Sequence, residues 1–167
     1  MVVIKNREEI LSLVGQIDHV LRGLQHTVED TRAATQAFQG SRPGPFDLRG
    51  FGSLLHDFYT GIEDVFETIA GDINGRLPDA SEWYKQLLVR MTVTVPGLRP
   101  AVISEELGWK LDEYMRFRHV FRNVYGYLLD WERLKPLLDR MDDVYVEFLR
   151  EIGSFRAFLL RLAEQLT

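Results

Sequence analysis

Residues 116–127, read as RFRHVFRNVYGY, bring together side chains that can act on phosphate groups. An α-helix turns by about 100° per residue, so the polar residues of this stretch are expected on two adjoining stripes of one helix. These are Arg118, Arg122 and Tyr125 on the first stripe, and His119 and Asn123 on the second. Guanidinium groups clamp phosphate oxygens, and imidazole exchanges a proton near neutral pH. The stretch therefore predicts a phosphate-handling surface.

The opposite side of the same helix is apolar, and its residues are expected to face the core. They are Phe117, Val120, Phe121 and Val124. No acidic residue lies within the motif, so its arginines are expected to be available to an anion. A salt-bridging, purely structural surface is the alternative interpretation of the same residues.

One further pattern concerns metal binding. A polar face of the helix predicted over residues 47–73 carries His56, Asp57, Glu63, Asp64 and Glu67. Carboxylates at this spacing can bind a metal, but a solvated face is the preferred interpretation. No metal or other cofactor is therefore predicted.

The motif resembles the R-x4-6-H-x-Y signature of the HEPN superfamily, a group of small helical domains that includes the HepT-like ribonuclease toxins. Residues 55–70, 99–107, 111–127 and 129–138 are also similar to HepT-like segments, in the expected order. The alignment places Arg118 at the arginine and Tyr125 at the tyrosine of the signature. Asn123 stands where the family has histidine, and His119 lies one turn earlier on the same stripe.

The resemblance implies a metal-independent endoribonuclease toxin of a HEPN/nucleotidyltransferase toxin–antitoxin module. Its substrate would be RNA, cleaved by attack of the ribose 2′-OH in a cleft that two subunits form together. The expected partners are thus a second copy of the chain and a nucleotidyltransferase antitoxin. The resemblance also implies that the antitoxin adenylylates Tyr125.

The expected catalytic residues are Arg118, His119, Arg122 and Asn123. An asparagine cannot transfer a proton, so Asn123 can only orient the phosphate or ribose by hydrogen bonds. His119 is then the only local candidate for acid–base chemistry, because its unperturbed pKa lies near 6.5. An asparagine at the histidine position of the signature also fits a non-catalytic HEPN interaction module that pairs with a nucleotidyltransferase. Both interpretations remain open.

Composition restricts the class of protein. The net charge of −5 argues against a general nucleic-acid coat protein, although a compact basic cleft needs few phosphate contacts. The chain has no cysteine, and no apolar run approaches the roughly 20 residues that span a bilayer. We expect a cytoplasmic protein with no membrane association.

Apolar residues at steps of three and four predict helices over residues 6–39, 47–73, 81–91 and 104–127. Ser81 and Ser104 are predicted N-caps. Asp130 is expected to cap a short turn, and Pro136 to occupy the first position of a last long helix. The predicted fold is all-α, a single up-and-down bundle of four to five helices over residues 1–167.

Overall fold

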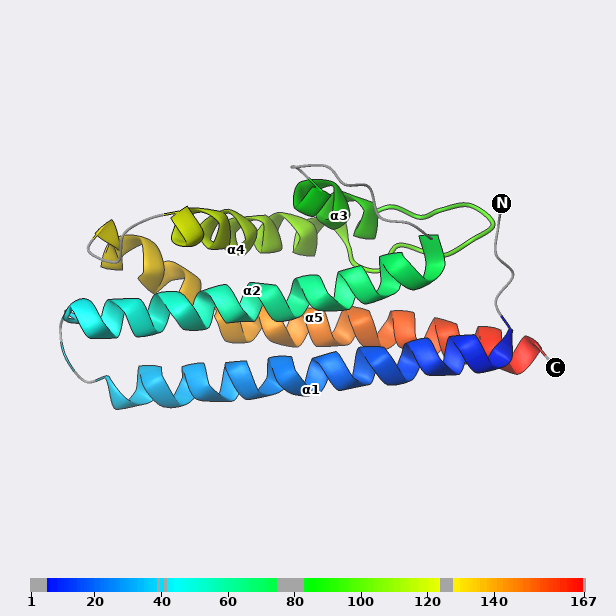
Figure 1. Cartoon of the computed structure of the whole chain (residues 1–167), viewed down its shortest axis with the longest axis horizontal. Helices are drawn as coiled ribbons and strands as arrows, with labels where there is room; N and C mark the ends of the chain where they lie inside the picture. The colour runs from blue at the N-terminus through cyan, green and yellow to red at the C-terminus, as the bar shows by residue number, and fades with distance from the viewer. Residues whose placement is uncertain (1–5, 39, 41, 75–82, 124–127, 167) are drawn as a thin grey trace.

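The computed structural model describes residues 6–38, 40, 42–74, 83–123 and 128–166. The helices within these ranges are α1 (Arg7–Ala37), α2 (Pro45–Asn74), α3 (Trp83–Met91), α4 (Glu105–Asn123) and α5 (Trp131–Gln165). The long helices α1, α2 and α5 pack against one another, and α3 and α4 lie along the other side of α2 (Figure 1). The predicted all-α bundle is confirmed. Within the described ranges the only β pairing is an isolated bridge between Val95 and Arg99.

The ends of the helices follow their capping residues. Asn6 begins α1 with a capping box, in which its side chain accepts from the Glu9 N–H at 2.9 Å and its own N–H donates to the Glu9 carboxylate at 3.0 Å. Ser104 caps α4, because its Oγ accepts from the Leu107 N–H at 3.1 Å. Both predicted starts are confirmed. Ser81 lies outside the described residues.

The predicted start of the last helix is wrong. Asp130 is the N-cap of α5 itself, accepting from the Glu132 N–H at 3.0 Å, and Pro136 lies inside the helix. A proline there removes one helical hydrogen bond. Leu134 and Leu137 are buried on both sides of it, and their burial outweighs that loss. In Figure 1 the first turns of α5, in gold, run at an angle to the rest of the helix.

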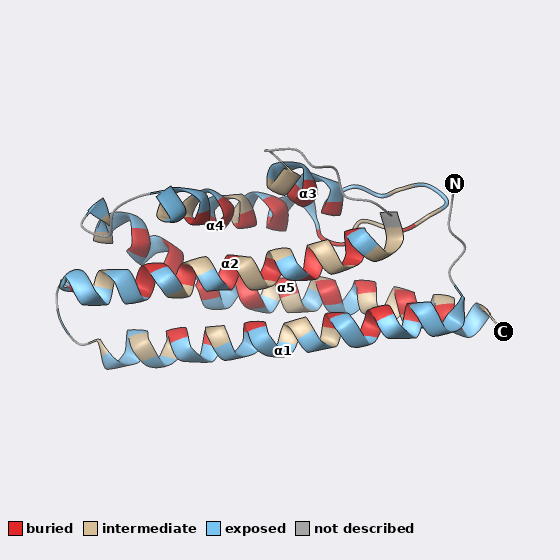
Figure 2. Ribbon diagram, viewed as in Figure 1, coloured by how far each residue is buried: buried red, intermediate tan, exposed pale blue. Residues whose placement is uncertain are grey.

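The core lies where α1, α2 and α5 meet, and it extends beneath α4 (Figure 2). Phe66 of α2 packs edge-on against Phe148 of α5, with ring centroids 5.9 Å apart. Beneath α4, the fully buried Tyr114 contacts the Phe58 ring at 5.2 Å and donates its hydroxyl to the Leu137 carbonyl at 2.7 Å. Tyr114 therefore ties α4 to both α2 and α5.

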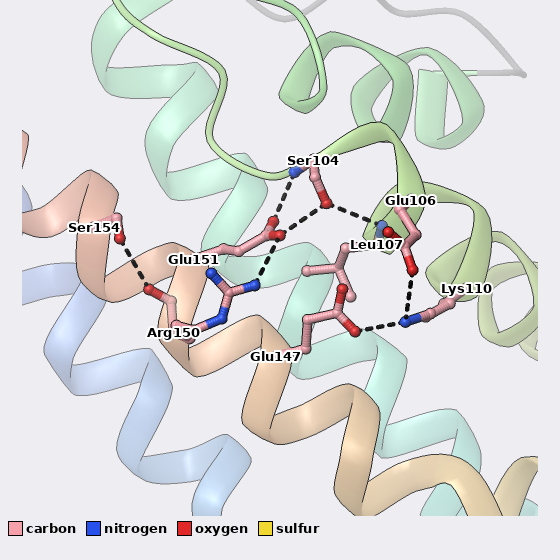
Figure 3. A network of polar contacts seen from close by, with 8 residues as sticks. All are labelled: Ser104, Glu106, Leu107, Lys110, Glu147, Arg150, Glu151 and Ser154. Carbon is pink, nitrogen blue, oxygen red and sulfur yellow. Dashed lines mark hydrogen bonds and ion pairs between the residues drawn. The ribbon is translucent and has the colours of Figure 1, made fainter.

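The first turn of α4 is held to α5 by a polar network (Figure 3). The Glu151 carboxylate accepts from the Ser104 N–H at 2.6 Å and from the Ser104 hydroxyl at 2.8 Å. One turn further along, Lys110 donates to Glu147 at 2.7 Å. These contacts fix where α4 begins, and hence where its far end lies.

None of the helices in the described ranges combines the length and the apolar character that crossing a membrane requires.

Candidate functional site

The buried face of α4 differs from the face that the motif alone predicts. It consists of Leu107, Gly108, Leu111, Tyr114, Met115 and Arg118. Val120, expected in the core, is 49% exposed, while Phe117 and Phe121 are only partly buried. Val124 lies outside the described residues. The apolar residues that precede the motif set the rotation of the helix, and this rotation turns Arg118 inward.

Arg118 is therefore a buried cation rather than part of an exposed stripe. Its Nη2 donates to the Glu63 carboxylate at 2.6 Å, and the two side chains are only 8% and 13% exposed. Its Nη1 lies 3.4 Å from the Thr60 hydroxyl, and its guanidinium lies over the Tyr59 ring at 5.1 Å. The motif has no acid of its own, but α2 supplies one across the helix interface.

Glu63 belongs to an acidic group on α2 that also contains Asp64 and Glu67. Burial raises the pKa of Asp64, and the nearby Arg118 partly opposes this. Burial also raises the pKa of Glu67, which the charges of Glu63 and Asp64 raise further. The expected solvated face is thus wrong for Glu63, whose carboxylate faces α4. No cluster of metal-ligating side chains was found among the described residues.

His119 lies on the outside of α4 and is exposed. Its ring stacks on Tyr84 of α3, with centroids 5.5 Å apart and an angle of 18° between the planes. Tyr84 therefore holds the imidazole in one orientation while leaving it open to solvent. Sequence reasoning missed Tyr84, since nothing in the motif indicates which residue of a separate helix would cover the ring.

Arg122 and Asn123 are exposed at the C-terminal end of α4. Within the described ranges, no hydrogen bond or ion pair joins Arg122 to another residue. The Asn123 amide donates to the His119 carbonyl at 2.8 Å, so the donor end of this side chain is bound to its own helix. Tyr125, the predicted modification site, lies outside the described residues.

The structure thus divides the predicted site residues between two surfaces of α4. His119 and Arg122 are neighbours on its outside, three residues apart, and Asn123 follows His119 by one turn. Arg118 lies beneath them, in contact with α2. The outer group offers an imidazole, an exposed guanidinium and an amide to a ligand, and Arg118 fixes the helix that carries them.

Comparison with known proteins agrees with the family resemblance of the sequence. A protein-family model described as HepT-like protein matches residues 50–159, which include α3 and α4 and most of α2 and α5. Neither the curated proteins nor the solved structures gave a match. Since the family model covers well over half of the sequence, the chain belongs to the HepT-like protein family.

Proposed function

We propose that this chain is the endoribonuclease toxin of a HEPN/nucleotidyltransferase toxin–antitoxin module. Its family supports the general assignment, because HepT-like proteins are typically parts of toxin–antitoxin systems. One observation carries the ribonuclease proposal: an exposed imidazole, that of His119, is held in place by Tyr84 beside the exposed guanidinium of Arg122.

The proposed reaction uses the RNA itself as the nucleophile. The ribose 2′-oxygen attacks the adjacent phosphorus, the bond from phosphorus to the 5′-oxygen breaks, and a 2′,3′-cyclic phosphate forms. One proton leaves the 2′-OH and one must reach the departing 5′-oxygen. His119 in its neutral form accepts the first proton, and in its protonated form it donates the second. No metal or cofactor takes part.

Arg122 is the proposed phosphate ligand, since its guanidinium is exposed and stays protonated. Asn123 has its amide N–H group bound to the His119 carbonyl, but its amide oxygen can still accept a hydrogen bond from a ribose hydroxyl. Arg118 acts from beneath by fixing α4 to α2, so its catalytic contribution is the placement of His119.

A non-catalytic interaction module is the second candidate, and a specific observation favours it. Glu63 neutralises Arg118 inside the fold, and the motif position that would hold histidine holds an asparagine bound to its own helix. On this alternative, the chain binds a nucleotidyltransferase partner without cleaving RNA.

Cleavage of a structured RNA by the purified protein, with excess chelator, distinguishes the two candidates. We expect cleavage by the wild-type protein, and a loss of about 10²- to 10⁴-fold in His119→Ala, the typical value of one proton-transfer group. Arg122→Ala should lose about 10²-fold or more. His26→Ala is the matched control, because that histidine is 80% exposed on α1.

Undiminished cleavage by His119→Ala would remove the acid–base role of His119. Cleavage that also survives in a His119→Ala/Arg122→Ala double variant would identify a contaminating nuclease. A wild-type protein that binds its nucleotidyltransferase partner but leaves RNA intact would establish the non-catalytic module.

The partner part of the proposal concerns Tyr125, which lies two residues beyond Asn123. An AMP group on its phenol would bring a phosphate close to Arg122, where a charge-assisted contact would compete with RNA. Co-expression with a nucleotidyltransferase encoded beside this chain, followed by mass spectrometry, should show one added AMP that Tyr125→Phe abolishes. An AMP adduct that persists in Tyr125→Phe would place the modification elsewhere.

A further inference from the structure

Helix α3 is the short helix that carries Tyr84, and it lies against α2 and α4 (Figure 1). Its buried side chains are Leu87, Leu88 and Met91. Near its start, Tyr84 stacks on His119 of α4. Eight residues later, just beyond its end, Thr92 meets the first turn of α4 at Gly108. Two contacts about 12 Å apart along α3 therefore determine how it lies on α4.

Gly108 is buried in α4, although glycine is a weaker helix former than alanine. A Cβ atom added at this position would lie 2.7 Å from Cγ2 of Thr92, well inside van der Waals contact. Thr92 cannot turn its methyl group away freely, because its hydroxyl donates to the Val89 carbonyl at 2.7 Å. The lack of a side chain at position 108 therefore permits the close approach of α3 to α4.

Arg99, in the connection between α3 and α4, also holds the end of α3. It is only 3% exposed. Its Nη2 donates to the Arg90 carbonyl at 3.0 Å, and its Nη1 donates to the Val93 and Pro100 carbonyls at 3.0 and 3.1 Å. A cation suits this place, because the last carbonyls of a helix lack helical donors and carry partial negative charge.

Main-chain hydrogen bonds join the same end of α3 to the start of α4. The Met91 carbonyl accepts from the Val102 N–H at 2.8 Å and from the Ile103 N–H at 3.1 Å. Val102 and Ile103 are both buried, directly before the Ser104 cap. We call residues 90–108, which contain all of these contacts, the α3–α4 junction. The junction ties the end of α3 to the start of α4.

We propose that the α3–α4 junction positions Tyr84 over His119, which makes Gly108 and Arg99 positioning residues of the candidate site. Neither residue acts on His119 directly, since Gly108 precedes it by eleven residues, about 16 Å along α4. Their effect travels through α3, because moving the end of a short helix also moves its start. The inference rests on the proposed function only for its effect on RNA cleavage.

The alternative is that burial of the apolar side chains of α3 holds Tyr84 in place without the junction. The two explanations differ in what a change at Gly108 does. If the junction sets the position of α3, a side chain at position 108 displaces Tyr84 from His119. If apolar burial is sufficient, the stack between the two rings survives that change.

Nuclear magnetic resonance of the imidazole protons measures the stack without RNA. The ring current of Tyr84 should shift the His119 signal upfield, and the loss of one signal in His119→Ala identifies it among the four histidines. Tyr84→Leu should move the signal to the position of an exposed histidine such as His26, which is 80% exposed. Spectra at about pH 9, above the ordinary range of histidine, exclude effects of protonation.

Substitutions in the junction should displace the His119 signal to different extents. Gly108→Val and Arg99→Met should move it most of the way to its position in Tyr84→Leu, and Gly108→Ala part of the way. Adding Thr92→Ser to Gly108→Ala removes the opposing methyl group and keeps the hydroxyl, so the signal should return to its wild-type position. Gly153→Ala on α5 is the matched control, because a Cβ atom there meets open space.

Circular dichroism establishes that each variant keeps its helix content. An unmoved His119 signal in folded Gly108→Val and Arg99→Met would overturn the proposal. If these larger changes prevent folding, Gly108→Ala and its Thr92→Ser rescue decide. An unmoved signal in Gly108→Ala, or a displaced signal that Thr92→Ser fails to restore, would then overturn the proposal.

RNA cleavage shows whether this position matters for the reaction. Gly108→Ala should lower kcat about 10-fold, since a misplacement of about 1 Å can cost about 10²-fold. KM should change little, because Arg122, the proposed phosphate ligand, stays exposed. Thr92→Ser should restore kcat together with the His119 signal, whereas a general loss of stability would not follow that signal.

The two measurements separate this inference from the proposed function. A protein whose His119 signal depends on Gly108 but which leaves RNA intact would keep the positioning of Tyr84 and remove the nuclease. A nuclease whose kcat stays constant while the His119 signal moves would keep the nuclease and overturn the role of Gly108 and Arg99.

Discussion

The two ends of α4 are attached to the bundle by different forces. Near its start, Leu107 and Leu111 are completely buried, and the Glu151 carboxylate binds the Ser104 backbone and hydroxyl. Near its end, the last inward-facing residue is Arg118, held by the Glu63 charge, and the apolar residues that follow it are exposed (Val120) or only partly buried (Phe121). The first end is fixed mainly by apolar burial and the second by an ion pair.

This difference indicates which substitutions affect the stability of the fold and which affect the position of the residues proposed for chemistry. Apolar burial tolerates small rearrangements of side chains, whereas a buried ion pair is sensitive to the loss of either charge. The residues proposed for chemistry follow Arg118 directly in the chain. Their position therefore depends on one electrostatic contact and on the stack between Tyr84 and His119.

The largest effect is expected at the C-terminal end of α4, which the ion pair between Arg118 and Glu63 holds; we call it the charged end. Arg118→Met should lower the free energy of unfolding by about 3–5 kcal/mol, because it leaves the Glu63 carboxylate buried without a cation. A double variant, Arg118→Met/Glu63→Leu, removes both charges and should recover most of that loss. Denaturant unfolding measures both. If the single variant costs under about 1 kcal/mol, the pair is not a buried contact in solution.

Most of the fold could be predicted because apolar periodicity and capping are local. Asn6 and Ser104 begin their helices as the sequence indicates, since each cap involves residues within three positions along the chain. The predicted break at Pro136 failed for a tertiary reason. Burial of Leu134 and Leu137 outweighs the loss of one backbone hydrogen bond, and the sequence does not show what those leucines pack against.

The candidate site could be predicted less completely. The motif predicts that α4 carries the site, and the family match covers this helix. Its rotation could not be read from the motif alone, because Leu107, Leu111 and Tyr114, which precede the polar part of the motif, decide which side faces inward. The partners of Arg118 and His119 come from α2 and α3, far away in the chain. Local spacing carries no information about such contacts.

An intermediate effect is expected at the N-terminal end of α4, which Ser104 caps. Glu151→Ala leaves the Ser104 N–H and hydroxyl without their acceptor and should cost about 1–3 kcal/mol. Asp139→Ala is the control, since it removes an exposed ion pair to Lys135 and should change stability by less than about 0.5 kcal/mol. Hydrogen exchange should accelerate in the first turn of α4 and change little around His119. Equal acceleration at both ends would contradict the independence of the two attachments.

The smallest effect concerns Glu67, which shares the acidic group beneath the charged end. Burial and the charges of Glu63 and Asp64 raise the pKa of Glu67 in the folded state. Because this pKa is raised, ionisation of the Glu67 side chain is less favourable in the folded protein than in the unfolded chain. Glu67→Gln should therefore stabilise the fold at pH 7, by about 0.3–0.5 kcal/mol for a screened, partly exposed group.

That gain should disappear as the pH falls below about 4, the ordinary range of glutamate, because both states of the wild type then bind the proton. Thermal unfolding at several pH values measures the difference, with the exposed Glu164→Gln on α5 as control. A gain that is independent of pH would mean that packing, rather than charge, distinguishes glutamine from glutamate at position 67. Arg118 and Glu63 would then be the only charged groups of this cluster that affect the stability of the charged end.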